Sequence, residues 1–258
     1  MTFARTDDQR ALEHALAPFF AKSVSEGSTD WRTIVVGFGL EGLGRSEDAG
    51  GLGTGAREAA IIARALGQAG IALPWAEHWV AARLGAGSAS DEPLASSAQQ
   101  VAELAARGNR AAWAEDALTI LHCAETAGLC DALLADTVAF AKERRQFGVA
   151  IATFQVLRHR MVDMRLAHEQ ATAMTGYALD LIDAEATPGD EPRGKAVSAA
   201  RVLCEDAVRL VAGGAVQIHG AMGLTEELRI GRLFRRASEL AQRDGTGRSH
   251  LRRYAGTE

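Results

Sequence analysis

The chain of 258 residues is 47% hydrophobic and 24% charged, with a formal net charge of −5. A chain of this length can form one large domain or two small ones and bury a sizeable core. The negative charge offers no basic face to nucleic acid or to an anionic membrane, so neither is expected as a partner. Aromatic residues make up only 5% of the chain and prolines number 5, a composition that favours helix.

The three cysteines, Cys123, Cys130 and Cys204, are odd in number and form no CxxC pair. This pattern favours thiols that act as small apolar fillers in a reduced compartment. No apolar run approaches the roughly 18 residues of a membrane span, and no signal-peptide pattern follows Met1. We therefore expect a cytoplasmic protein.

The first predicted helix begins with a capping box at Thr6-Asp7-Asp8-Gln9. In this motif the Thr6 and Gln9 side chains each accept a hydrogen bond from the backbone N–H of the other residue. Apolar residues then recur at helical spacing from Ala11 to Phe20 and form one stripe. The glycine-rich residues 48–53 predict a loop.

A second helix is predicted at about Arg57 to Leu66, with Gly67 and Gly70 as stop signals. Beyond residue 83 the chain is rich in small and polar residues and loses its pattern until residue 114. We divide the chain accordingly into a helical N-terminal domain at residues 1–83, a connector at residues 84–113 and a C-terminal domain at residues 114–258.

Long helical segments are predicted in the C-terminal domain, where apolar residues recur at positions i, i+3 and i+4. Their approximate bounds are Ala114–Lys142, Phe154–Ala184, Arg193–Ala212 and Glu226–Ala241. The breaks between them fall at Gly148, at residues 187–190 and at Gly213-Gly214. Long helices with short connections are typical of an antiparallel four-helix bundle. Because no segment alternates at period two, the sequence predicts an all-α fold without strands.

Two segments carry residues suited to ligand binding. The first, at residues 143–148, ends a predicted helix with Arg144 and Arg145. Cations are favoured at a helix C-terminus in any case, but paired arginines can also offer a guanidinium fork to a phosphate. The second, at residues 217–223, contains His219 and Gly220. Gly220 can cap a helix or admit a ligand close to the backbone, and a lone histidine is more often packed than catalytic.

Together these segments resemble the signatures of acyl-CoA dehydrogenases. The pattern R-x-QFG-x-x-I-x-x-FQ-x-x-x-H-x-x-x-DM is matched by Arg144, Gln146-Phe147-Gly148, Ile151, Phe154-Gln155, His159 and Asp163-Met164. The pattern Q-x-HGGxGxT-x-E resembles the segment Gln217–Glu226: Gln217 to Thr225 match its first nine positions, except that Ala221 replaces a glycine. Residues 39–53 are similar to a glycine-rich loop of the family, and Pro74-Trp75-Ala76-Glu77 is similar to a stretch of its smaller, heteromeric members. The likeness covers about residues 8–83 and 114–254.

The resemblance implies FAD bound across a subunit interface. Arg144 would face the pyrophosphate, Gln146 and Phe147 would pack beside it, and Gln217 and Gly220 would meet the adenosine or pyrophosphate end, all toward a flavin seated in a neighbouring subunit. The full set of implied cofactor-binding positions is Arg144, Gln146, Phe147, Gln155, Gln217, Gly220 and Ala221.

The chain also departs from the family. Full-length members carry a β-domain that cradles the flavin ring, and the roughly thirty residues at 84–113 are too few for a five-stranded sheet. The family's catalytic glutamate aligns with Asp244, which precedes Gly245-Thr246 and is shorter by one methylene. Misplacement on the order of 1 Å can cost roughly 100-fold in rate. Without a ring cradle, Asp244 has no flavin of its own to serve, so we interpret it as a vestige of the catalytic base.

The leading hypothesis is the small subunit of a heteromeric, α2β2 acyl-CoA dehydrogenase that oxidises a bulky CoA thioester such as a steroid side chain. A larger dehydrogenase subunit would then be its partner. The alternatives are a scaffold subunit that touches no cofactor, and a homo-oligomeric helical enzyme that uses Asp244 in another reaction. Retention of Arg144, Gln146 and Phe147 favours the first hypothesis over a scaffold, which has no use for a phosphate fork.

Overall fold

The computed structural model describes residues 6–86, 92–107, 110–184, 191–220 and 228–257. These residues form a helical fold, so the all-α prediction is confirmed. The helices are α1 (Asp7–Ser25), α2 (Ala56–Ala69), α3 (Trp75–Arg83), α4 (Ala98–Arg107), α5 (Ala111–Glu143), α6 (Gln155–Asp183), α7 (Glu191–His219), α8 (Arg229–Ala241) and α9 (Gly247–Ala255). Single turns of 3₁₀- or π-helix add Arg32–Val36, Glu47–Ala49 and Ile151–Thr153. Helices α3, α4 and α9 were not predicted from the sequence.

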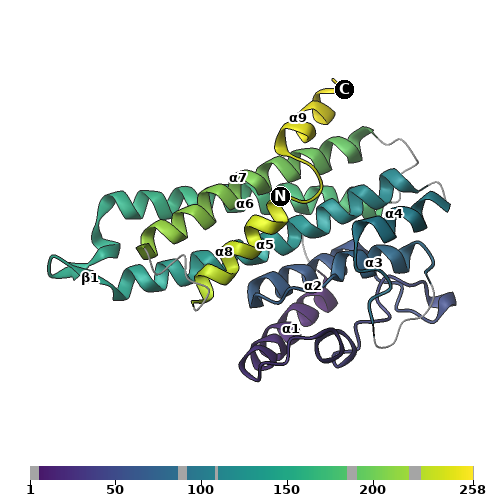
Figure 1. The fold of residues 1–258 in the computed structure, drawn as a ribbon, viewed down its shortest axis with the longest axis horizontal. Helices are drawn as coiled ribbons and strands as arrows, with labels where there is room; N and C mark the ends of the chain where they lie inside the picture. Colours follow the sequence, from purple (N-terminus) through teal and green to yellow (C-terminus); the bar gives the residue numbers. More distant parts are fainter. Residues whose placement is uncertain (1–5, 87–91, 108–109, 185–190, 221–227, 258) are drawn as a thin grey trace.

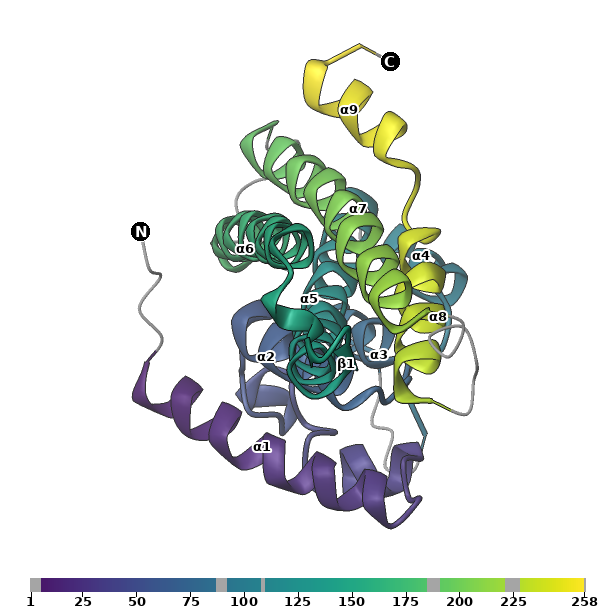
Figure 2. The ribbon, with the colours of Figure 1, turned by 90° about the vertical axis from the view of Figure 1, so that its left-hand side faces the viewer.

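The long helices of the C-terminal part lie side by side (Figure 1). Helices α5, α6 and α7 pack against one another, and the shorter α8 packs against α5 and α7. Helix α2 covers α5 and α6, α1 lies on α2, and α3 and α4 lie on α5. Figure 2 looks toward the end of this arrangement and shows α6 at its edge, with α9 extending beyond α7.

The capping box predicted at the start of α1 is present. The backbone N–H of Gln9 donates to Thr6 Oγ1 over 3.2 Å, and the backbone N–H of Thr6 donates to Gln9 Oε1 over 3.1 Å. The Gln9 side chain also donates to Glu58 Oε1 of α2 over 2.7 Å. The same residue therefore caps α1 and ties it to α2.

Helices α2 and α5 cross at two glycines. A Cβ atom on Gly67 would lie 2.1 Å from the carbonyl oxygen of Glu125, and one on Gly128 would lie 1.9 Å from that of Arg64. Any side chain at either position would therefore separate the two backbones. Of the two predicted stop signals, Gly70 is confirmed, because it caps α2 in the left-handed conformation. The prediction for Gly67 was wrong, because the helix continues through it to Ala69.

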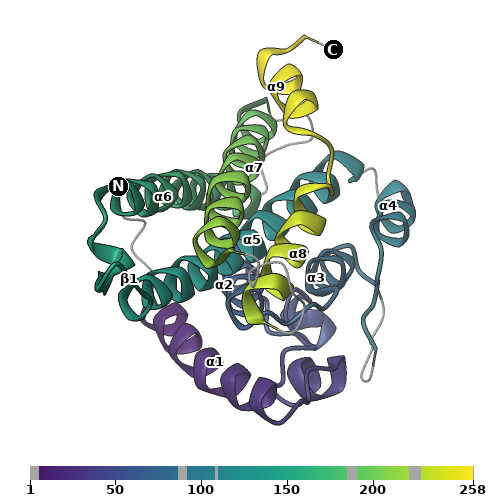
Figure 3. The same ribbon diagram turned by 60° about the vertical axis from the view of Figure 1, so that its left-hand side comes forward.

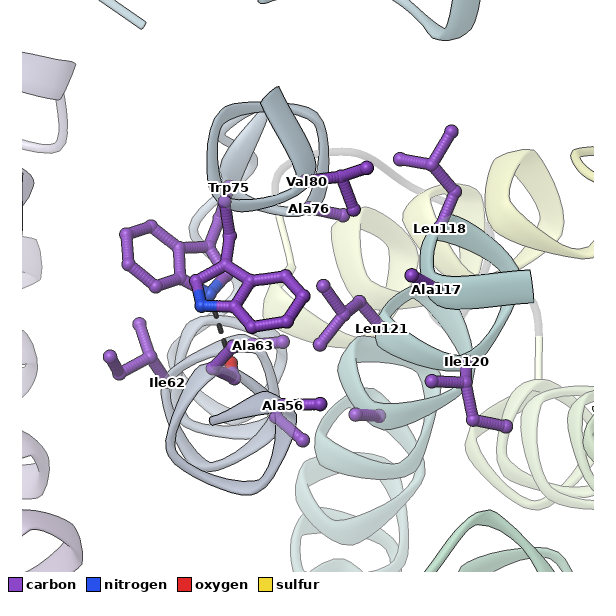
Figure 4. Packing of buried hydrophobic residues seen from close by; sticks show 14 of the residues in the cluster. Ala56, Ile62, Ala63, Trp75, Ala76, Val80, Ala117, Leu118, Ile120 and Leu121 are labelled. Atoms are coloured by element: carbon purple, nitrogen blue, oxygen red, sulfur yellow. Dashed lines mark hydrogen bonds between the residues drawn. The ribbon is translucent and has the colours of Figure 1, made fainter. Parts of the chain in front are cut away.

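The N-terminal helices and one half of the bundle share a hydrophobic core. Trp75 of α3 is almost fully buried and donates its indole N–H to the carbonyl oxygen of Ala59 over 2.9 Å. Figure 4 shows this ring over α2, with Leu121 of α5 nearby. A second core, around Leu129 and Leu133, lies where α8 packs on the far half of the bundle.

The predicted break at Gly213-Gly214 was wrong, because α7 runs through both glycines to His219. A Cβ atom on Gly214 would lie 2.7 Å from the sulfur of Met164 in α6. Glycine in a helix interior costs about 1 kcal/mol relative to alanine, and here close packing of α6 on α7 offsets that cost.

The prediction of no strands was also wrong at one place. Strands β1 (Arg145–Gln146) and β2 (Val149–Ala150) form an antiparallel hairpin, with Arg145 opposite Ala150 and Gln146 opposite Val149. The turn residues Phe147 and Gly148 have φ values of 52° and 82°. Positive φ at both positions is the geometry that joins two strands tightly. Two-residue strands are too short to produce a period-two pattern.

Helix α5 is an exception to the expectation that no apolar run approaches the length of a membrane span, because its length and composition would allow it to cross a membrane. The core helix of a globular protein passes the same test, and α5 is mostly buried by the helices around it. All three cysteines are free and buried, as the apolar-filler interpretation predicted.

Candidate functional site

The hairpin that follows α5 presents Arg144 and Phe147 to solvent. The backbone of Arg144 is held at both ends, since its N–H donates to the Phe140 carbonyl and its carbonyl accepts from the Ile151 N–H, both over 2.8 Å. Its guanidinium forms no hydrogen bond or ion pair with any residue that the structure describes. Phe147 is 92% exposed at the tip of the hairpin and meets only the edge of Phe154. A free cation and a bare aromatic ring thus project from the same turn.

A groove of about 810 Å³ runs between α6 and α7. Gln155 at the start of α6 and Gln217 near the end of α7 both line it, so the structure brings together two residues that lie 62 positions apart in the sequence. Gly213 and Gly214 form part of its floor, and His159 contributes a polar side chain. Because the β1–β2 hairpin lies between the end of α5 and the start of α6, Arg144 and Gln155 belong to the same end of the molecule (Figures 1 and 3).

His219 is a packed residue at the end of α7. Its Nδ1 atom lies 2.9 Å from the Ala215 carbonyl, and its ring stacks on Phe140 of α5 with the centroids 4.2 Å apart. The sequence-based interpretation of His219 as a packed histidine is therefore confirmed. Gly220 follows with φ of 69°, and a Cβ atom there would meet no other atom within 4 Å. Its glycine is required by the backbone conformation. Ala221 lies outside the described residues.

The groove and the hairpin suit the diphosphate and adenosine end of FAD. Arginine presents planar, permanently charged donors to phosphate, and the amides of Gln155 and Gln217 can donate and accept hydrogen bonds. A volume of about 810 Å³ is within the usual range for ligand sites. Around the groove the described residues form helices and one hairpin of two-residue strands, and among them there is no larger sheet to hold the flavin ring.

Asp244 lies elsewhere, in the loop between α8 and α9. It is absent from the lining of the groove and instead borders a cavity of about 750 Å³ between α4, α5 and α9. Its Oδ2 atom lies 2.7 Å from Nδ1 of His122 in α5, and both side chains are largely buried. The Nε2 atom of His122 lies 3.7 Å from Oε1 of Glu77, which also accepts from Arg243 over 3.1 Å. At 3.7 Å the His122–Glu77 interaction is an attraction of charges and not a hydrogen bond.

Electrostatics favour a charged pair at neutral pH at this point. Burial alone would lower the pKa of His122, but its interactions with Asp244 and Glu77 raise it to about 9. Burial would likewise raise the pKa of Asp244, but the hydrogen bond and charge of His122 hold it below its ordinary value. A carboxylate with a lowered pKa and a fixed cationic partner is a poor acceptor of a substrate proton.

The loop that carries Asp244 is itself held rigidly. The buried Arg201 donates through Nη2 to the carbonyl oxygens of Ala241, Arg243 and Gly245, over 2.5, 3.1 and 3.1 Å. His250 contacts the Asp244 carbonyl oxygen through Nε2 over 2.6 Å. The left-handed backbone of Asp244, with φ of 57°, is therefore fixed on both sides. This geometry keeps the side chain turned toward His122.

His122 and Glu77 were not predicted as site residues from the sequence. His122 lies 122 residues before Asp244 in the middle of an apolar helix, where a histidine gives no local signal. Glu77 was visible only as part of the stretch Pro74-Trp75-Ala76-Glu77.

Residues 118–256 match the family model for the acyl-CoA dehydrogenase C-terminal domain. The chain belongs to the acyl-CoA dehydrogenase family. Among curated relatives, acyl-CoA dehydrogenase IpdE2 of Mycolicibacterium smegmatis is 37% identical over 138 residues, which is 54% of this chain and 41% of that protein. IpdE2 of Mycobacterium tuberculosis is 34% identical over 138 residues, 54% of this chain and 40% of that protein. The chain thus matches about two fifths of the length of these relatives.

Solved structures of acyl-CoA dehydrogenases share the fold over nearly the whole chain. The ChsE4-ChsE5 complex of Mycobacterium tuberculosis superposes with a TM-score of 0.81 at 18% identity, covering 99% of this chain and 98% of that one. A steroid ACAD, Tcur3481-Tcur3483, gives a TM-score of 0.81 at 16% identity, with 97% of each chain covered. Butyryl-CoA dehydrogenase of Megasphaera elsdenii gives 0.77 at 16% identity, covering 99% of this chain and 98% of that chain.

Proposed function

We propose that this chain is a subunit of a flavin-dependent acyl-CoA dehydrogenase and lends binding groups to FAD seated in a larger partner subunit. The enzyme would introduce an α,β double bond into a CoA thioester with a bulky acyl group, such as a steroid side chain. Membership of the acyl-CoA dehydrogenase family supports the reaction class. The likeness to ChsE4-ChsE5 and to the steroid ACAD Tcur3481-Tcur3483 supports an assembly of two kinds of subunit, which we propose to be α2β2.

The observation that carries the proposal is the pairing of a free Arg144 with the groove lined by Gln155 and Gln217. Most other arginines of the described bundle are engaged, for example Arg64 with Asp131 and Arg236 with Glu125. A cation held by a fixed backbone but left without an acid is suited to an external phosphate. An exposed aromatic ring such as Phe147 is suited to a partner's surface.

A bound flavin would supply the oxidant of the desaturation, which is chemistry that no amino-acid side chain provides. The residues of this chain would bind and orient: Arg144 would neutralise diphosphate charge, and Gln155 and Gln217 would fix the adenosine end by hydrogen bonds. Phe147 would cover the diphosphate and exclude water from it. The α-proton of the thioester would be removed by a carboxylate of the larger subunit, because Asp244 is already paired with His122.

The alternative function is that of a scaffold that stabilises the larger subunit and touches no cofactor. The described residues around the groove form no flavin-holding sheet, which is compatible with either function. The guanidinium of Arg144, unpaired among the described residues, favours the flavin-binding function. Burying an arginine in a protein–protein interface that offers it no carboxylate would weaken the complex.

The test is flavin retention by the complex of this chain with the larger subunit. Arg144→Ala should weaken flavin binding about ten- to hundredfold, since a charge-assisted hydrogen bond contributes roughly 1.5–3 kcal/mol. Flavin retained by the purified complex is measured from its visible absorption at successive dilutions. The matched control is Arg252→Ala, which removes an exposed arginine from α9 and should leave flavin content unchanged.

The neighbouring Arg145 gives a second comparison. It lies in strand β1 of the same hairpin, and its guanidinium donates to the Gly148 carbonyl oxygen. Loss of flavin in Arg145→Ala and not in Arg144→Ala would show that Arg145, and not Arg144, contacts the phosphate. Unchanged flavin in both variants would contradict the proposal and favour the scaffold function.

A further inference from the structure

A small cavity lies where the N-terminal helices meet the bundle. Its volume is about 100 Å³, and its walls come from α1, α2, α5 and α6. It shares no lining residue with the α6–α7 groove or with the cavity beside Asp244. An apolar cavity of about 150 Å³ holds a benzene molecule, so this volume suits a ligand of roughly four to six non-hydrogen atoms.

The hydroxyl group of Thr172 in α6 is left without a partner at this cavity. Its oxygen atom is buried and forms no hydrogen bond with a described residue. The other threonines of α5 and α6 each donate to the carbonyl oxygen four residues earlier, and they are Thr119, Thr126, Thr137 and Thr175. A buried polar group is normally hydrogen-bonded. Because Thr172 lines the cavity, its hydroxyl is available to an occupant.

Two arginines of α2 give the cavity its charge. Arg64 directs Nε and Nη2 to the Oδ2 atom of Asp131, each over 2.8 Å, and its Nη1 forms no hydrogen bond with a described residue. Arg57 donates through Nε to Oδ1 of Asp180 over 2.6 Å. Both arginines line the cavity, whereas neither aspartate does. The charges nearest an occupant are therefore positive.

Much of the remaining wall is apolar. Ala60 and Ile61 of α2 face Ala124 and Ala127 of α5 across the cavity, and Leu179 of α6 completes this part of the lining. Alanine side chains end at Cβ, so they leave a space between the helices that a short hydrocarbon chain can fill. No carboxylate belongs to the lining, so the cavity offers an amine or other cation no acidic partner.

We propose that this cavity is a binding site for a short aliphatic carboxylate of about four carbons. The carboxylate accepts hydrogen bonds from the Thr172 hydroxyl and from Nη1 of Arg64, a pairing that guanidinium groups favour. Its hydrocarbon chain lies on the alanines of α2 and α5. The bound molecule contacts α2, α5 and α6 together and so holds the N-terminal helices on the bundle. The site goes beyond the proposed function and does not depend on flavin.

Butyrate binding to the full chain, measured by saturation-transfer difference NMR at constant ionic strength, tests the site. The wild-type chain should bind butyrate saturably, and Thr172→Val should weaken binding about tenfold or more, because a charge-assisted hydrogen bond is lost. Valine keeps the shape of threonine and removes only a hydroxyl without a partner, so this variant should fold with an unchanged or higher Tm. The matched control is Thr119→Val, because Thr119 lines the separate cavity beside Asp244. It should leave butyrate binding unchanged.

Neutral butyramide separates the charge of the ligand from its shape. It should bind about tenfold or more weakly than butyrate, because it lacks the charge that the guanidinium groups attract. Absence of saturable butyrate binding, equal binding by the wild type and Thr172→Val, weakened binding in Thr119→Val, or equal binding of butyramide would each overturn the proposal. Failure of the flavin proposal would appear separately, as flavin retained in Arg144→Ala.

Discussion

The Nδ1 atom of His122 and the Oδ2 atom of Asp244 lie 2.7 Å apart in a largely buried site. The pair joins the middle of α5 to the loop between α8 and α9, and Glu77 extends it to α3. Asp244, which we predicted to align with the family's catalytic glutamate, is therefore part of an ion pair that holds three segments of the fold together. This relationship supports the interpretation of Asp244 as a vestigial base with a structural role.

Asp244→Asn should therefore affect stability more than catalysis. Turnover of the complex with the larger subunit should stay within about threefold of wild type, which is less than 1 kcal/mol in the activation barrier. The free energy of unfolding should fall by on the order of 3 kcal/mol, because the buried charge of His122 loses its partner. Chemical denaturation and steady-state turnover measure the two effects. A thousandfold loss of turnover with flavin content intact would instead identify Asp244 as the catalytic base.

Stability should also decline at alkaline pH. The pKa of His122 is raised to about 9 in the folded protein, above its ordinary value of 6.5. A raised pKa contributes stability that is complete below about pH 6.5 and is lost as the pH rises through about 9. The free energy of unfolding should therefore fall from pH 7 to pH 10. In His122→Gln the fall over this interval should be markedly smaller, and an equal fall in both proteins would contradict the assignment.

The glycine crossing of α2 and α5 should not tolerate alanine. Gly67→Ala and Gly128→Ala each place a Cβ atom about 2 Å from a backbone carbonyl oxygen, so the helices must separate. Each change should lower the free energy of unfolding by about 1–3 kcal/mol or more, the usual cost of overpacking. Gly213→Ala is the control, because a Cβ atom there meets nothing within 4 Å. It should stabilise α7 by about 0.5–1 kcal/mol, as alanine is the better helix former.

The chain without the proposed larger subunit should bind flavin weakly or not at all. Its described residues provide Arg144, Gln155 and Gln217 for one end of FAD but no sheet for the ring. The absorption spectrum of the chain purified alone should therefore lack flavin bands, whereas the complex with the larger subunit should be yellow. A chain that carries stoichiometric flavin by itself would contradict this prediction.

Much of the helical fold follows from the sequence, because helical periodicity and capping are local properties. The Thr6–Gln9 box and the apolar spacing of α5 and α6 could be read within a few turns of helix. Glycines were misinterpreted because their role depends on contacts between distant segments and not on local sequence. Gly67 and Gly213-Gly214 look like stop signals locally, but α2 and α7 continue through them. At Gly67 and Gly214 the local cost of glycine is offset by close packing of a second helix, which the sequence does not show.

The candidate site likewise combines residues that the sequence marks with contacts that only the tertiary structure shows. The family signature alone marked Arg144, Gln155 and Gln217, but only the packing of α6 on α7 places the two glutamines on one groove. The ion pair of Asp244 with His122 and Glu77 was decided entirely by tertiary structure. A periodic pattern shows which face of a helix is buried. Which other helix that face packs against depends on packing between distant segments. Burial and charge partners, which set the pKa values, arise only from that packing.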